Sequence, residues 1–130
     1  MILMPLLRGS LETLGRRYIE RTLADVGRLH YWLMCLPERP AESLARIAKL
    51  AHSIQGSAAS FGFGAVGASA GAIERLVRSS SRSPATPVDA ALTRDLLRRV
   101  EDLARLVAHA AESVPAAAAV PAKSGVSIRQ

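Results

Sequence analysis

The apolar residues of this chain recur at helical spacing in two long segments of its N-terminal half. Between residues 10 and 36 the apolar positions are Leu11, Leu14, Ile19, Leu23, Val26, Leu33 and Leu36. Between residues 40 and 61 the spacing alternates between three and four, through Leu44, Ile47, Ala51, Ile54, Ala58 and Phe61. Such spacing places apolar side chains on one face of an α-helix. It predicts two amphipathic helices, separated by Pro37 and Pro40.

Two further helices follow from the same pattern. Gly62 comes directly after the second apolar stripe, where glycine commonly ends a helix. The third helix is predicted over residues 65–78, with Val66, Ala70, Ile73 and Val77 on one face. Gly67 and Gly71 lie one turn apart in it, and their small size would let a neighbouring helix approach closely. The fourth helix is predicted to begin with Thr86 as N-cap and Pro87 in its first turn. Its apolar face comprises Leu92, Leu96, Val100, Leu103, Val107 and Ala110.

These elements predict an all-α fold, because no segment alternates apolar and polar residues as a strand does. Four amphipathic helices with short connections are typical of an antiparallel up-down-up-down four-helix bundle. The bundle is expected to span residues 10–113. Residues 1–9 would form a short N-terminal segment, and the Ala/Pro-rich residues 114–130 a disordered tail.

Composition and charge restrict the functional classes. The 130 residues are 49% hydrophobic and only 4% aromatic, and the net charge is +6. The single cysteine, Cys35, cannot form an internal disulfide, and the three scattered histidines do not make a zinc site with it. No Asp, Glu, Lys or Arg occurs between Leu50 and Ile73, but this stretch contains five glycines and several polar residues, too many for a membrane-spanning helix. A cytoplasmic protein of a bacterium with an Arg- and Ala-rich composition is expected.

His52 is the histidine with an unusual position. At about 100° per residue it points roughly 130° away from the apolar stripe of its helix, so it is predicted on the outside. Its neighbours on that face are small: Ala45, Ala48, Gly56 and Ala59. Most isolated surface histidines have no function, but a face of Ala and Gly lets the backbone of a partner approach the imidazole, and docking faces are depleted of charge at their centre.

Residues 50–62, LAHSIQGSAASFG, resemble the signature of histidine phosphotransfer (HPt) domains. That pattern reads approximately A-H-x-L-K-G-x-A-x-x-x-G, followed by an apolar residue and then a Leu-Glu pair. Val66 occupies the later apolar position here, and Ile73-Glu74 occupies the place of the pair. The resemblance covers residues 44–77 and agrees with the four predicted helices.

The resemblance implies a phosphorelay carrier without ATP-binding or autonomous catalytic function. His52 would accept a phosphoryl group from an aspartyl phosphate on a receiver domain and pass it to another receiver. Partners would be response-regulator receivers and a hybrid histidine kinase, and the magnesium would belong to the receiver, so no cofactor is expected on this chain. The family usually has Lys three residues after the histidine, where this chain has Gln55; Lys49, one turn before His52, is the candidate replacement cation.

Two other functions remain open. A protein with this bundle could act as an adaptor that binds a receiver or kinase without carrying phosphate, and Gln55 favours this alternative. The net charge also permits a nucleic-acid binder, but the arginines alternate with acidic residues and form no continuous run, so no nucleic-acid partner is expected. The sequence G-x-G-x-x-G at residues 62–67 follows a predicted helix rather than a strand and does not indicate dinucleotide binding.

Overall fold

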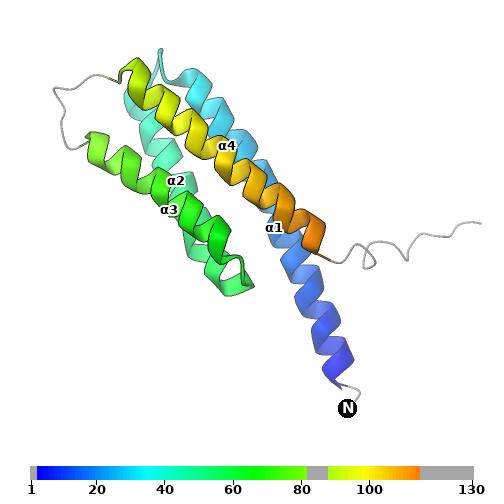
Figure 1. Ribbon diagram of the computed structural model, residues 1–130. Helices are drawn as coiled ribbons and strands as arrows, with labels where there is room; N and C mark the ends of the chain where they lie inside the picture. Colours follow the sequence, from blue (N-terminus) through cyan, green and yellow to red (C-terminus); the bar gives the residue numbers. More distant parts are fainter. Residues whose placement is uncertain (1–2, 82–87, 115–130) are drawn as a thin grey trace, which may run out of the picture.

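The computed structural model describes residues 3–81 and 88–114, with side chains described for residues 9–80 and 88–114. Within these ranges the chain forms four α-helices and no strand (Figure 1). The helices are α1 (Leu3–Cys35), α2 (Pro40–Ala58), α3 (Gly64–Ser81) and α4 (Ala90–Ser113), with a short 3-10 helix η1 (Ala59–Phe61) after α2. The all-α prediction is confirmed for this part of the chain.

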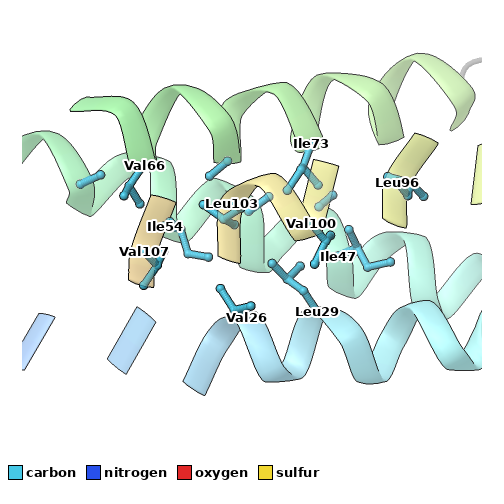
Figure 2. Packing of buried hydrophobic residues seen from close by; sticks show 14 of the residues in the cluster. Val26, Leu29, Ile47, Ile54, Val66, Ile73, Leu96, Val100, Leu103 and Val107 are labelled. Carbon is cyan, nitrogen blue, oxygen red and sulfur yellow. The ribbon is translucent and has the colours of Figure 1, made fainter. Parts of the chain in front are cut away.

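Each helix packs against two others in a closed ring, α1 on α2, α2 on α3, α3 on α4 and α4 on α1. The contact between α2 and α3 is the most extensive. Figure 2 shows buried side chains from all four helices meeting at the centre, among them Leu29 of α1, Ile54 of α2, Ile73 of α3 and Leu103 of α4. The core is thus aliphatic, as the low aromatic content suggests.

The apolar stripes of α3 and α4 are buried as predicted. Those of α3 are fully enclosed, and in α4 only the first member, Leu92, stays partly exposed. Gly62 ends η1 with a φ of 81°, the left-handed conformation that glycine adopts without steric cost. The predicted N-cap of α4 is wrong: the cap is Asp89, whose carboxylate accepts a hydrogen bond from the Leu92 amide at 2.8 Å. Thr86 and Pro87 lie outside the described residues, as does the predicted tail from Pro115 onward.

The predicted stripe of α1 is only partly correct. The helix begins at Leu3, seven residues before the expected start, and its N-terminal turns extend beyond the other helices (Figure 1). Leu11 is therefore 66% exposed and Leu14 47% exposed, because no helix lies opposite them. Leu23 is also exposed, since it lies on the outer side of α1. Tyr18 and Leu29, which the predicted stripe omits, are buried instead.

An aromatic cluster closes one end of the bundle. The Tyr18 ring stacks on Phe61 and Phe63, with ring centroids 4.8 and 5.6 Å apart, and its hydroxyl donates to the Ile54 carbonyl at 3.2 Å. Phe61, predicted as a core residue, remains 37% exposed because it lies in η1, past the last turn of α2. None of the described helices is both long and apolar enough to span a membrane.

Candidate functional site

His52 lies in the middle of α2 with 70% of its side chain exposed, which confirms the orientation predicted from the helical spacing. On the opposite side of α2, the buried residues Ile47, Ala51 and Ile54 pack into the core. Because the imidazole is near the helix centre, it stands on a rigid element and not on a fraying end. This arrangement leaves the ring accessible from solvent.

One ring nitrogen of His52 is held by α3. Nδ1 lies 3.1 Å from Oε1 of Glu74, whose side chain is only 11% exposed. An ionised carboxylate can only accept hydrogen bonds, so in the neutral ring the proton resides on Nδ1 and is donated to Glu74. The other nitrogen, Nε2, then carries the free electron pair and points away from Glu74. The contact fixes both the tautomer and the orientation of the ring.

Glu74 is kept ionised by its other neighbours. Arg78, one turn further along α3, donates to Oε2 from Nε at 2.8 Å, and its Nη2 forms an ion pair with the same oxygen at 2.7 Å. Burial raises the pKa of Glu74, but hydrogen bonds from Arg78 and His52, with the charges of both residues, outweigh it and lower the pKa below its ordinary value. The carboxylate beside Nδ1 is therefore charged at neutral pH.

Two glycines of α3 set the close contact that brings Glu74 to His52. A Cβ atom on Gly67 would lie 3.1 Å from the Ala58 Cβ, and one on Gly71 would lie 2.8 Å from Nε2 of Gln55. The pairs 52–74, 55–71 and 58–67 show that α2 and α3 run in opposite directions where they meet. The close approach predicted for these glycines is thus confirmed.

The strip of small residues around His52 is partly as predicted. Ala45, Gly56 and Ala59 are exposed, and nothing within 4 Å would meet a Cβ atom on Gly56. Ala48 is not part of the strip, because it is only 8% exposed. Ala48 lies two turns before Gln55, on the flank of α2 that faces α3. It would be exposed on an isolated helix, but it is buried in the bundle. The exposed strip is open on the side of α2 away from α3.

The two polar residues predicted to flank His52 lie on opposite sides of it. Gln55 is one turn after His52 and lies against Gly71 of α3. Lys49 is one turn before His52, on the open side, and is exposed without an ion pair to any of the described residues. Within those residues no group of three or more His, Cys, Asp or Glu side chains could hold a metal ion.

The sequence matches the Hpt domain family over residues 14–109, which is most of the chain. The chain belongs to this family. Searches of the curated proteins and of the solved structures give no match. The resemblance in residues 44–77 is therefore extended by the family match to all four helices. Hpt domains are histidine phosphotransfer modules of two-component signalling, which carry a phosphoryl group and interact with receiver domains and kinases.

In this Hpt domain the sequence did not identify the residues that hold the histidine. In the sequence Glu74 stands out only as the second member of the Ile73-Glu74 pair, and the pattern predicts no role for Arg78. The available signal is that Glu74 is the first acidic residue after a stretch of more than twenty residues without Asp, Glu, Lys or Arg. Which side chain it would meet depends on how α3 pairs with α2.

Proposed function

We propose that His52 accepts a phosphoryl group from the aspartyl phosphate of a receiver domain and donates it to a second receiver, in a phosphorelay of the bacterial cytoplasm. The observation that carries this proposal is the His52–Glu74 contact, which leaves Nε2 as the free nitrogen of an exposed ring. No other histidine has such a setting: His30 faces the Val26 carbonyl of its own helix, and His109 lies 3.9 Å from Glu112 near the end of α4.

The transfer step needs little from this chain besides a positioned nucleophile. The Nε2 electron pair of His52 forms a bond to phosphorus while the bond from phosphorus to the aspartate oxygen breaks, and the carboxylate leaves with that electron pair. Glu74 keeps the proton on Nδ1 and offsets the positive charge that develops on the ring. Phosphoryl transfer depends mainly on positioning and charge stabilisation, and the receiver supplies the magnesium ion. The chain itself then requires no cofactor.

The proposed docking face is the open strip of Ala45, Gly56 and Ala59 beside His52. Glycine within a helix costs about 1 kcal/mol relative to alanine. Gly56 has open space around it, so the packing of this chain does not explain why position 56 is a glycine. A receiver that must bring its aspartate close to Nε2 supplies the reason, because a larger residue at this position would hold it away.

The antiparallel up-down-up-down order of the helices is part of this proposal, and the reversed pairing of α2 and α3 supports it. Gln55 and Lys49 are proposed as the neighbours of the phosphoryl group on α2. The alternative, an adaptor that binds a receiver or a kinase without carrying phosphate, is favoured by the uncharged Gln55.

A labelling experiment separates the two functions. The protein is incubated with a receiver carrying a radioactive aspartyl phosphate, in parallel with the His52→Gln variant. A carrier takes up label that is acid-labile and alkali-stable, and the variant takes up none. If the wild-type protein binds the receiver but remains unlabelled, it is an adaptor. If the His52→Gln variant is labelled as well as the wild type, another residue is the acceptor.

A further inference from the structure

A phosphoryl group on Nε2 of His52 brings negative charge to the surface between α2 and α3, and the cations around it differ in availability. Arg78 is already engaged by both of its contacts to Glu74. Gln55, on the side of α3, is uncharged. Lys49 lies on the opposite side of His52. A cation that faces the phosphoryl group from α3 must therefore be a residue other than Arg78.

Arg75 of α3 reaches this position. Its Nη1 atom lies 3.3 Å from the point that a Cβ atom on Gly71 would occupy, and Nε2 of Gln55 lies 2.8 Å from the same point. The Arg75 side chain thus turns back along α3 by one turn, and its guanidinium lies beside the Gln55 amide. Because 52–74 and 55–71 are the facing pairs of α2 and α3, this is the level directly after His52.

The charge of Arg75 is free to act on a new anion. Among the described residues Arg75 has no ion pair, whereas Arg78 on the next turn is paired with Glu74. Its side chain is exposed, so the guanidinium can move by rotation about its own bonds without disturbing the core. Gly71 supplies the room, since a side chain there would collide with both groups.

We propose that Arg75 and Gln55 together bind the phosphoryl oxygens of phosphorylated His52, Arg75 with its charge and Gln55 with its amide N–H groups. The inference rests on the proposed function, because it concerns the phosphorylated form of His52. The planar guanidinium presents several donors in a fixed geometry that suits phosphoryl oxygens. A cation for the phosphoryl group thus comes from α3 as well, whereas the sequence pattern indicated only Lys49 of α2.

The direct test is made on the phosphorylated protein alone, so that binding to a receiver does not contribute. His52 is phosphorylated in the full chain with phosphoramidate, and the ionisation of the phosphoryl group is followed by phosphorus NMR. A nearby cation favours the doubly charged form. At an exposed site its loss changes the equilibrium by at most about fivefold, so Arg75→Gln should raise the titration midpoint by up to about 0.7 of a pH unit.

Three further variants make the result specific. Arg75→Lys keeps the charge and should stay close to the wild type. Arg94→Gln removes an equally exposed arginine without an ion pair from α4, and should leave the midpoint unchanged. Gln55→Lys combined with Arg75→Gln places a cation on α2 at the same level and should restore most of the loss.

The outcomes distinguish this inference from the proposed function. If the wild-type protein takes up no label from phosphoramidate or from a phosphorylated receiver, the proposed function fails. If His52 is labelled and Arg75→Gln titrates like Arg94→Gln, the role of Arg75 is refuted while the proposed function stands. A midpoint that moves in Arg75→Gln and is restored by Gln55→Lys supports the inference.

Discussion

At the scale of single residues, His52 differs from the other histidines in having its partner on another helix. His30 and His109 face groups of their own helices, three or four residues away, which any helix would bring near. The His52–Glu74 contact joins residues 22 positions apart and exists only because α3 packs on α2. The bundle therefore determines which nitrogen of His52 is available for chemistry.

The lowered pKa of Glu74 predicts how the stability of the fold depends on pH. The ordinary pKa, 4.5, applies to the unfolded chain, and the folded pKa is lower because Arg78 and His52 outweigh the effect of burial. Above 4.5 both states carry the carboxylate, and the stabilisation is fully present. Below 4.5 the unfolded state takes up a proton first, so stability is lost until the folded pKa is passed.

Glu74→Gln removes this titration while keeping an acceptor at the site. Urea unfolding at neutral pH and below pH 4.5 should therefore show a smaller acid-induced loss of stability in Glu74→Gln than in the wild type. Equal losses in the two proteins would mean that Glu74 does not contribute to the acid sensitivity.

A second prediction at this scale concerns Gly56. Gly56→Arg should leave the helical content unchanged, because the space around Gly56 is open. It should weaken receiver binding, measured by calorimetry, by at least about fivefold, since crowding a packed contact costs about 1–3 kcal/mol. The matched control is Gly27→Arg, at an exposed glycine of α1 with equally open surroundings. Equal affinities for Gly56→Arg and Gly27→Arg would place the receiver elsewhere.

At the scale of helices, the contact between α2 and α3 is made close by glycine on one side and alanine on the other. Gly67 meets Ala58, which is fully buried, and neither can yield without a shift of the helix backbones. Gly71 meets only the ends of the Gln55 and Arg75 side chains, which can rotate away. The distance between the two helices, and with it the reach from Glu74 to His52, is thus most sensitive to the residue at position 67.

The three substitutions Gly67→Ala, Gly71→Ala and Gly56→Ala should therefore change the free energy of unfolding by different amounts, and not all in the same direction. Alanine in place of a helical glycine gains about 0.5–1 kcal/mol where there is room, so Gly56→Ala should stabilise the protein. At Gly67 the crowding cost of about 1–3 kcal/mol exceeds this gain, and Gly67→Ala should destabilise it. Gly71→Ala should lie between them. Urea unfolding midpoints test the order, and a stabilised Gly67→Ala would show that α2 and α3 are not in tight contact there.

At the scale of the whole molecule, the bundle is shorter than its first helix. α1 has 33 residues, whereas α2 has 19 and α4 has 24. All buried hydrophobic residues of the described chain lie between Tyr18 and Ala110. Residues 9–17 of α1 thus add length to the helix without adding a buried hydrophobic side chain.

Two leucines of α1 should show this difference in unfolding experiments. Leu29 is fully buried, and Leu29→Ala should cost about 2–5 kcal/mol, as is usual for a leucine in a packed core. Leu11 is largely exposed, and Leu11→Ala should change the free energy of unfolding by no more than about 0.5 kcal/mol. A large loss for Leu11→Ala would mean that this face is covered in solution.

Removal of residues 115–130 is the complementary test at the other end. Because the last buried residue of the described chain is Ala110 and the family match ends at residue 109, the shortened protein should keep the thermal unfolding midpoint of the full chain. It should also accept label at His52 to the same extent. A lower midpoint would assign the last sixteen residues a structural role.

The sequence by itself determined most of the local structure. The apolar spacing predicted four helices and the exposure of His52, because each depends on the order of residues within one helix. Gly62 ends the 3-10 helix that follows α2, while α2 itself ends at Ala58, and Gly67 and Gly71 allow the expected close approach. The motif around His52 predicted the family, which the match over residues 14–109 confirms.

Only the tertiary structure decided which neighbours meet. A helical spacing assigns each helix one buried direction, but α2 is covered by both α1 and α3, and Ala48, outside the predicted stripe, is buried as well. The partner of His52 depends on the offset between α2 and α3, and the exposure of Leu11 depends on where the other helices end. These properties depend on how the helices pack against one another. The packing of α3 on α2 brings Glu74, Arg78 and Arg75 near His52, and no pattern within a single helix indicates this arrangement.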